Sequence, residues 1–364
     1  MSLFGKKEAE TPQNKVSQAP KIQSSAALLS KEGRANQNSA QLAMEEALLS
    51  VNDTKFSDLY ITPDKTCYIM SGLSESGLRV ARCTDLQEFI NAVKEKYDGE
   101  YSSYSLNYKG RVYRIERSIA SEGEQFCARK MPTSIPSIEK LGFPPSVCKY
   151  LMSLANRTGL ILFAGATGAG KSTSIAALLK KYLEMEGGYA FTIEDPIEMP
   201  LDGVYKTRNG DLGLCKQTIP PQGVWEDGLK SALRSMPKYI YLGEIRSGAA
   251  AVELLRASTS GHLVFSTVHA NNVVDAIQAL AKYASTGGIS EDLAYDQIGN
   301  SLLACIHQKL EGFPRHLTIE TLFANPDTNG VCSVRAAIRS GSLNVASQME
   351  AQKNRLERGM PLWS

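Results

Sequence analysis

A glycine-rich segment near the middle of the chain has the residue types that bind phosphate. Residues 165–173 fit the pattern G-x-x-x-x-G-K-[ST], and they are Gly165, Ala166, Thr167, Gly168, Ala169, Gly170, Lys171, Ser172 and Thr173. Glycines let the backbone curl so that successive N–H groups face one anion. Lys171 is predicted to reach the β- and γ-phosphates, and the Ser172 hydroxyl to ligate Mg²⁺. This phosphate loop therefore predicts a site for ATP with Mg²⁺.

The segments on either side of the phosphate loop fit the elements that such a loop needs. Residues 159–164 are continuously apolar, which is typical of a buried parallel strand. Residues 174–183 have apolar residues at helical spacing. The positive end of that helix is expected to point at the phosphates.

Acidic residues follow two other predicted strands. Glu244 comes just after the apolar run 239–242, and Glu194, Asp195 and Glu198 follow the run that ends at residue 193. The carboxyl ends of strands in open α/β sheets are where ligands bind. Glu244 is expected near Mg²⁺, directly or through a water, or near the attacking water. Taken alone, Glu244 is equally typical of an acid at the start of a helix. A solvated acidic turn is the simpler interpretation of Glu194, Asp195 and Glu198.

Two histidines flank a further apolar strand at residues 263–267. His262 precedes this strand and His269 follows it, and the chain has only 4 histidines. His269 is therefore expected at the nucleotide edge of the sheet, where it could hydrogen-bond to the γ-phosphate. The alternative is a strand-end histidine whose partner is backbone. A zinc site is not expected, because no cysteine or third histidine lies nearby in sequence.

Two arginines lie on consecutive predicted strands of the N-terminal part. Arg114 and Arg129 both precede a Pro- and Ser-rich stretch that reads as a linker. Phosphoryl-transfer sites often take an arginine from a neighbouring domain or subunit to neutralise charge in the transition state. Surface arginines on a hairpin are the simpler interpretation of this pattern.

Composition and periodicity predict two folded regions. The first has the mixed pattern of a small α+β domain, including a hairpin across Lys109 and Gly110, and a short helix is expected at residues 39–51. In the second, apolar strands alternate with helical stretches, which predicts a mostly parallel sheet; the expected strands are 160–164, 189–193, 239–242 and 263–267. The predicted regions are a flexible leader at 1–38, the small domain at 39–131, a linker at 132–137 and an α/β domain at 138–364.

Charge and cysteine usage exclude several classes of protein. The net charge is +2, from 40 basic and 38 acidic residues, so no general nucleic-acid-binding surface is expected. The 7 cysteines form no C-x-x-C pair, which favours reduced thiols in the cytoplasm. No apolar run reaches the roughly 20 residues that span a bilayer. Any membrane association is therefore expected to be peripheral and through partners.

Taken in order, four segments resemble the secretion ATPase superfamily, the motors of type II secretion, type IV pili and type IV secretion. Residues 165–173 resemble its Walker A box, 192–198 its Asp box, 242–246 its Walker B box and 261–269 its His box. The resemblance is greatest to the subfamily that retracts type IV pili. Residues 334–339 and 358–360 resemble the C-terminal segments of that subfamily.

This resemblance implies a fold and a set of roles. The implied fold is a RecA-like ATPase domain of the α/β class preceded by a smaller PAS-like domain, assembled as a homohexamer. The implied catalytic residues are Lys171, Glu198, Glu244, His269, Arg114 and Arg129. Glu194, Asp195, His262 and the phosphate loop are implied to contact the nucleotide. Ser172 and Glu244 are implied to serve Mg²⁺.

The implied function is ATP hydrolysis that drives pilus retraction, as in twitching motility, at the cytoplasmic face of the inner membrane through a platform protein. An ATPase of type IV secretion or conjugation, a RecA-like nucleic-acid motor and a nucleotide-gated scaffold without turnover are the alternatives. The sequence departs from the family at Met236, Lys238 and Ser247, where acidic residues are usual. These departures indicate a divergent branch, and they spare Lys171 and Glu244.

Overall fold

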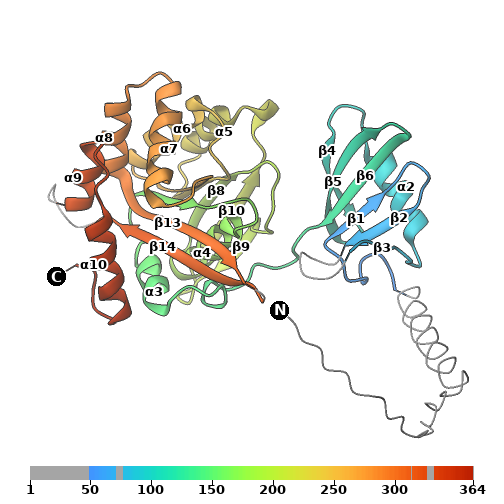
Figure 1. Ribbon diagram of the computed structural model, residues 1–364, viewed down its shortest axis with the longest axis horizontal. Helices are drawn as coiled ribbons and strands as arrows, with labels where there is room; N and C mark the ends of the chain where they lie inside the picture. The colour runs from blue at the N-terminus through green and yellow to red at the C-terminus, as the bar shows by residue number, and fades with distance from the viewer. Residues whose placement is uncertain (1–48, 71–76, 313, 326–331, 364) are drawn as a thin grey trace, which may run out of the picture.

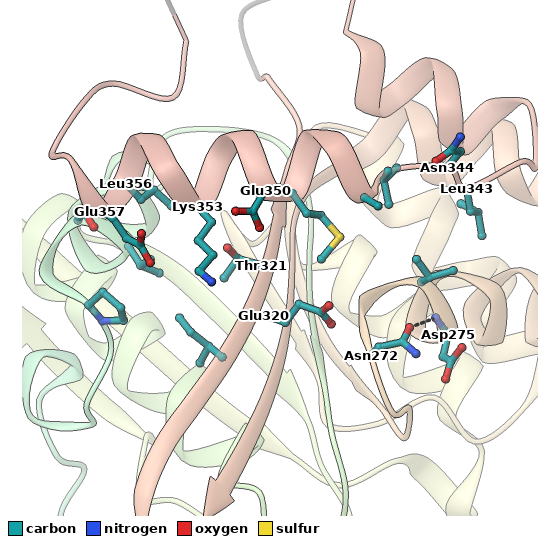
Figure 2. Close-up of a pocket in the computed structure, with 18 residues that line it drawn as sticks. Asn272, Asp275, Glu320, Thr321, Leu343, Asn344, Glu350, Lys353, Leu356 and Glu357 are labelled. Atoms are coloured by element: carbon teal, nitrogen blue, oxygen red, sulfur yellow. Dashed lines mark hydrogen bonds between the residues drawn. The ribbon is translucent and has the colours of Figure 1, made fainter.

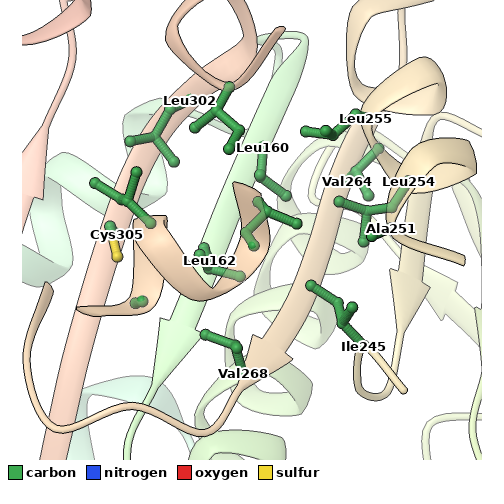
Figure 3. Packing of buried hydrophobic residues seen from close by; sticks show 14 of the residues in the cluster. Leu160, Leu162, Ile245, Ala251, Leu254, Leu255, Val264, Val268, Leu302 and Cys305 are labelled. Atoms are coloured by element: carbon green, nitrogen blue, oxygen red, sulfur yellow. The ribbon is translucent and has the colours of Figure 1, made fainter. Parts of the chain in front are cut away.

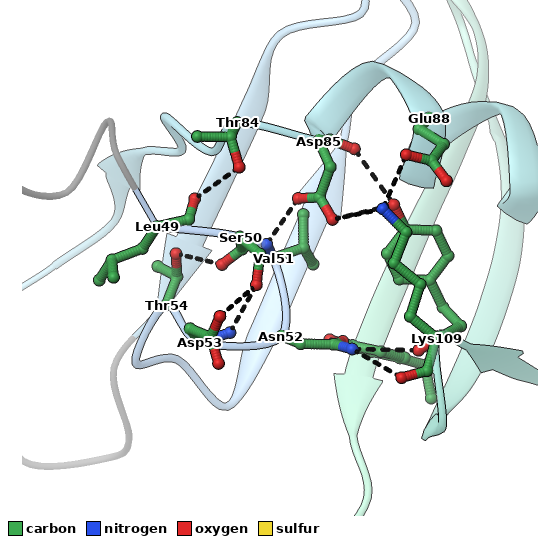
Figure 4. A network of polar contacts seen from close by, with 12 residues as sticks. Leu49, Ser50, Val51, Asn52, Asp53, Thr54, Thr84, Asp85, Glu88 and Lys109 are labelled. Carbon is green, nitrogen blue, oxygen red and sulfur yellow. Dashed lines mark hydrogen bonds and ion pairs between the residues drawn. The ribbon is translucent and has the colours of Figure 1, made fainter.

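The computed structural model describes residues 49–70, 77–312, 314–325 and 332–363. These residues form two β-sheets, each with its own hydrophobic core (Figure 1). The predicted leader and residues 39–48 of the predicted helix lie outside the described residues. Residues 49–51 of that helix form a bend and a turn instead, and the Val51 N–H donates to the Asp85 carboxylate at 2.7 Å (Figure 4).

The smaller sheet is antiparallel and has the strand order β3-β2-β1-β6-β5-β4. Helix α2 packs on it through the buried side chains of Phe89, Ile90 and Val93. The predicted hairpin across Lys109 and Gly110 is confirmed, because β4 and β5 pair on either side of it. The elements are β1 (Asp58–Ile61), β2 (Cys67–Met70), β3 (Arg79–Val80), α2 (Leu86–Lys96), β4 (Ser103–Tyr108), β5 (Arg111–Ala120) and β6 (Gly123–Lys130).

The larger sheet has the strand order β14-β13-β7-β12-β11-β8-β10-β9. The strands from β13 to β10 are parallel to one another, while β14 and β9 pair antiparallel at the two edges. Its strands are β7 (Gly159–Ala164), β8 (Gly188–Ile193), β9 (Gly203–Lys206), β10 (Leu212–Thr218), β11 (Tyr239–Leu242), β12 (Leu263–Val268), β13 (Leu302–Glu311) and β14 (His316–Phe323).

Helices cover both faces of this sheet (Figure 1). Side chains of strand β7 are buried alternately on the two faces. Leu160 and Leu162 pack with the helices of one face (Figure 3), and Ile161 and Phe163 pack with the helices of the other. One face carries α5 (Trp225–Arg234), α6 (Gly248–Thr259), α7 (Val273–Thr286), α8 (Glu291–Ser301) and α9 (Ser333–Arg339). The other carries η1 (Ile138–Lys140), α3 (Pro145–Ser153), α4 (Lys171–Glu186) and α10 (Ala346–Glu357), and a short turn η2 (Pro221–Gly223) precedes α5.

The order of the parallel strands places the chemically interesting loops along one edge. Strands β7, β12, β11 and β8 are neighbours, and the loops that follow them begin after Ala164, Val268, Leu242 and Ile193. These four strands are the ones predicted from the sequence, and the structure confirms them. Strands β9, β10, β13 and β14 have no counterpart among the sequence predictions.

Candidate nucleotide-binding site

The phosphate loop joins β7 to α4 and needs glycine at both of its ends. A Cβ on Gly165 would lie 2.3 Å from the carbonyl oxygen of Gln308, so no larger residue fits there. Gly170 has φ 84° and is the N-cap of α4, a left-handed conformation that favours glycine. The backbone of Gln308 therefore requires glycine at position 165, and the start of α4 favours glycine at position 170.

The Lys171 side chain is folded back onto its own loop. Its ammonium group donates to the carbonyl oxygens of Gly165 at 2.8 Å and Ala166 at 2.9 Å. Burial lowers the pKa of Lys171, and the carboxylates of Glu244 and Glu198 act against this. The Lys171 ammonium group thus lies within the phosphate loop, where both of its hydrogen-bond partners are backbone oxygens.

A cavity of about 530 Å³ opens beside the phosphate loop. Residues from the small sheet and from four loops of the large sheet line it together. The predicted site residues that the structure brings together here are Arg114, Arg129, Thr167, Gly168, Ala169, Gly170, Lys171, Ser172, Thr173, Glu194, Asp195, Glu198, Glu244 and His269. Gly165 and Ala166 do not line this cavity, but their carbonyl oxygens accept hydrogen bonds from Lys171.

Glu194 is the buried acid of this cavity. Its carboxylate Oε1 accepts hydrogen bonds from the Thr192 hydroxyl at 2.6 Å and from the Gln217 amide at 2.9 Å. Burial raises the pKa of Glu194 to about 6, although these two hydrogen bonds act to lower it. Glu194 can therefore change its charge near neutral pH.

Glu194 should make the stability of the protein depend on pH. Its pKa is about 6 in the folded protein against 4.5 for the free group, so the folded state binds the proton more tightly. The resulting stabilisation is complete below the unfolded pKa and is lost as pH rises through about 6. Lowering the pH from about 7.5 to about 5.5 should add about 1 kcal/mol to the free energy of unfolding from this group.

Urea unfolding at both pH values measures this contribution, because Glu194→Gln should lack it while keeping the side-chain shape. Glu253→Gln, on the outer helix α6, is the matched control and should keep the wild-type pH dependence. Identical pH profiles for the wild type and Glu194→Gln would contradict the assignment.

Glu244 lies where β11 ends, next to the side chains of Arg246 and His269. One carboxylate oxygen contacts the guanidinium of Arg246, and the other lies 3.8 Å from Nε2 of His269. Arg246 in turn stacks over the Trp225 ring at 5.2 Å and donates to the backbone oxygen of Asp195 at 3.3 Å. The loops after β8, β11 and β12 are joined through this group.

Arg114 and Arg129 lie directly opposite each other on β5 and β6. Asp58 on β1 accepts a hydrogen bond from Arg129 Nε at 2.7 Å. Like charges directly opposite on adjacent strands repel each other. Since both arginines line the cavity, an anion bound there would relieve this repulsion.

His262 is not brought to this cavity. It precedes β12, whereas the cavity lies beyond the carboxyl end of that strand at Val268, and six extended residues span roughly 20 Å. Nδ1 of His262 lies 2.6 Å from the carbonyl oxygen of Pro237, in the segment before β11. The structure therefore does not bring His262 to this cavity, and its nucleotide contact stays a prediction.

Several lining residues were absent from the sequence predictions. Tyr241, Trp225, Arg246 and Thr267 all line the cavity. The Tyr241 hydroxyl shares a hydrogen bond with Ser172, and burial raises the pKa of Tyr241 well above its usual value. Period-two alternation along β11 could have indicated that Tyr241 faces the same side of the sheet as the phosphate loop.

The donor set also fits a magnesium ion. Mg²⁺ usually keeps several waters and takes one or two protein carboxylates besides the phosphates of its nucleotide. The Ser172 hydroxyl and the Glu244 carboxylate line the same cavity and are oxygen ligands of this kind. Within the described residues, no cluster of three or more His, Cys, Asp or Glu side chains forms a separate metal site.

A larger cavity, of about 770 Å³, lies elsewhere, under α10. It is bounded by α10, β14 and the start of α7, and Glu320, Glu350 and Asp275 are among its polar side chains (Figure 2). None of the predicted site residues in the described chain lines it. The larger cavity is therefore not the candidate nucleotide site. The smaller one is, because the phosphate loop, acids and arginines line it.

Comparison with known proteins agrees with this geometry. A family described as type II/IV secretion system protein matches residues 108–339. The competence protein ComGA of Bacillus subtilis is 32% identical over 256 residues, 66% of this chain and 68% of the relative. The type IV pilus ATPase PilU of Pseudomonas aeruginosa is 32% identical over 207 residues, 54% of this chain and 50% of the relative. The chain spans about half the length of the first curated relatives it matches.

A solved structure of the pilus retraction motor PilT with bound ADP is similar over most of the chain. Its TM-score is 0.64 and its sequence identity 25%, covering 84% of this chain and 87% of that one. The predicted α/β fold of a RecA-like ATPase domain with a smaller N-terminal domain is confirmed. No described helix has both the length and the apolar character to cross a membrane. The chain belongs to the type II/IV secretion system protein family, the secretion ATPases that its four motifs resemble.

Proposed function

We propose that this protein is a motor ATPase that hydrolyses ATP to power type IV pilus dynamics, with retraction as the direction of work. The observation that carries the proposal is the convergence on one cavity of the phosphate loop, two strand-end acids and a pair of arginines from the other sheet. Family membership supports ATPase activity, and the likeness to PilT with ADP supports nucleotide binding.

In the proposed reaction, ATP enters with its phosphates against the loop and the start of α4. Lys171 leaves the carbonyl oxygens of Gly165 and Ala166 and binds the phosphates. Glu244 or Glu198 orients the attacking water and takes its proton. Ser172 and the phosphates would hold Mg²⁺, which would supply positive charge beside the γ-phosphate.

Arg114 and Arg129 complete the proposed site from the small sheet. As the γ-phosphate separates, their positive charges stabilise the transition state, and ADP and phosphate are the products. Because these arginines and the phosphate loop belong to different sheets, loss of phosphate would change the attraction between the two parts. That change is the proposed source of motion, with residues 132–137 as the connection between the domains.

We further propose that six copies form a ring at the cytoplasmic face of the inner membrane and pass this motion to a platform protein. The net charge of +2 supports a protein partner over nucleic acid. DNA-stimulated turnover with a steep salt dependence would instead favour the nucleic-acid motor.

Deletion of the gene tests the direction of work, because the surface pili can be counted directly. Retraction predicts cells with excess pili, which complementation by the wild-type gene should reverse. Bare cells would show assembly instead, and normal pili with loss of plasmid transfer would show a secretion or conjugation ATPase.

A further inference from the structure

Gln308 joins the strand β13 to the phosphate loop. It follows His307, the last residue of β13 that pairs with β7, and its side chain is buried with 1% of its surface exposed. Its amide Nε2 donates to the carbonyl oxygen of Ala169 at 2.5 Å. The contact joins residues 139 positions apart in the chain, so it is a tertiary contact and not local loop structure.

The same residue touches both ends of the loop. Its backbone oxygen would lie 2.3 Å from a Cβ on Gly165, and its Nε2 3.3 Å from a Cβ on Gly170. Gln308 therefore packs against the two glycines that begin and end the loop, as well as bonding to Ala169 between them.

The hydrogen bond to Ala169 sets the orientation of one peptide group. In a planar trans peptide the C=O of Ala169 and the N–H of Gly170 point in opposite directions. Since Gln308 holds the carbonyl oxygen on the β13 side, the Gly170 N–H is directed to the other side, and Gly170 lines the nucleotide cavity. A reversed peptide would present a carbonyl oxygen to the phosphates and repel them.

This bond matters most once Lys171 has moved. In the present conformation Lys171 donates hydrogen bonds to the carbonyl oxygens of Gly165 and Ala166. The Ala169 N–H donates to the Ala166 oxygen at 3.2 Å. When Lys171 turns to the phosphates its two contacts are lost. The bond from Gln308 to the Ala169 carbonyl oxygen would then still orient this part of the loop.

The other end of the Gln308 amide has no partner. Its Oε1 is buried and accepts no hydrogen bond from the described residues. The reverse orientation of the amide is disfavoured, because Oε1 would then face the Ala169 oxygen. A buried acceptor without a donor costs stability, which offsets part of what the bond from Nε2 to Ala169 contributes.

We propose that Gln308 is a positioning residue that holds the Ala169 carbonyl so that the Gly170 N–H faces the nucleotide phosphates. The inference rests on the proposed ATPase function and adds a residue outside the four sequence motifs. Gln308 touches no reacting atom, so its effect is expected in nucleotide affinity as well as in turnover.

Gln308→Met tests this role, because methionine fills the same space without donor or acceptor. Titration with a fluorescent ADP analogue should show affinity reduced about tenfold, which corresponds to ~1.4 kcal/mol. The unfolding temperature of the nucleotide-free variant should stay near that of the wild type, because the substitution removes the unpartnered Oε1 but also leaves the Ala169 carbonyl oxygen without its donor. The rise in unfolding temperature on adding ADP should shrink.

Gln297→Met is the matched control. Gln297 lies on α8 and also has a buried Oε1 without a partner in the described chain, but it does not contact the loop. We expect unchanged ADP affinity for this variant, and an equal loss in both variants would overturn the proposal.

Gln308→Glu is the second variant, in case Gln308→Met fails to fold. It keeps the shape but replaces the donor by a carboxylate facing the Ala169 oxygen, so it should bind ADP more weakly than Gln308→Met. Wild-type affinity in either variant would overturn the role of Gln308. If the wild type itself bound no ADP while folded, the proposed function would fail instead, which separates the two outcomes.

Discussion

Replacing Lys171 with alanine should reduce ATP turnover by on the order of a thousandfold or more. Lys171 is buried at the start of α4 and is poised on the Gly165 and Ala166 carbonyl oxygens. Its loss removes the mobile positive charge that the γ-phosphate would meet. A thousandfold loss corresponds to ~4 kcal/mol of transition-state stabilisation.

Phosphate release at saturating Mg·ATP measures this effect, and Lys180→Ala is the matched control. Lys180 lies on the same helix and pairs with Glu184 at the surface, so its removal should leave turnover unchanged. Near wild-type turnover in a folded Lys171→Ala protein would show that the phosphate loop is not the site of hydrolysis.

Replacing Glu244 with glutamine should separate binding from hydrolysis. Glutamine preserves the shape beside Arg246 and His269 but cannot accept the proton of the attacking water. ATP binding should persist while turnover falls about 10²–10⁴-fold, the usual contribution of a general base. Single-turnover phosphate release, alongside a nucleotide titration, gives both quantities.

Glu198→Gln decides between the two candidate bases. Glu198 lines the same cavity and also acts on the Lys171 ammonium group. If turnover survived in Glu244→Gln but was lost in Glu198→Gln, the base would be Glu198. Glu253→Gln on α6, whose carboxylate pairs with Arg256, should be neutral in the same assay.

The strand-end motifs could be predicted because each depends on a short stretch of sequence. Strands β7, β8, β11 and β12 are apolar runs that stop at a glycine or polar residue, so Lys171, Glu194 and Glu244 could be placed at strand ends. In a parallel sheet all such ends share one edge. The same reasoning could not choose the order of the strands, which determines how near these residues lie.

Features that depend on tertiary contacts escaped prediction. Strand β13 follows α8 without a turn signal, since Ser301 ends the helix and Leu302 begins the strand, so the apolar pattern there is ambiguous between helix and strand. Because strand β13 was not predicted, the contact of Gln308 with the phosphate loop could not be predicted either. The opposition of Arg114 and Arg129 requires the register of β5 and β6, which two isolated strands do not reveal.

The position of His262 could not be predicted from the sequence motif alone. It belongs to the same sequence box as His269, yet the strand between them places the two at opposite ends of β12. Only His269 lines the cavity with Glu244. Two residues of one sequence motif can therefore lie far apart in the fold.

The most direct test of the central claim is phosphate release by the purified wild-type chain at saturating ATP, with and without Mg²⁺. The account predicts turnover above background that requires Mg²⁺, as expected if Ser172 and the nucleotide phosphates hold the ion beside Glu244. A folded protein that binds ATP but releases phosphate only at the background rate would contradict it.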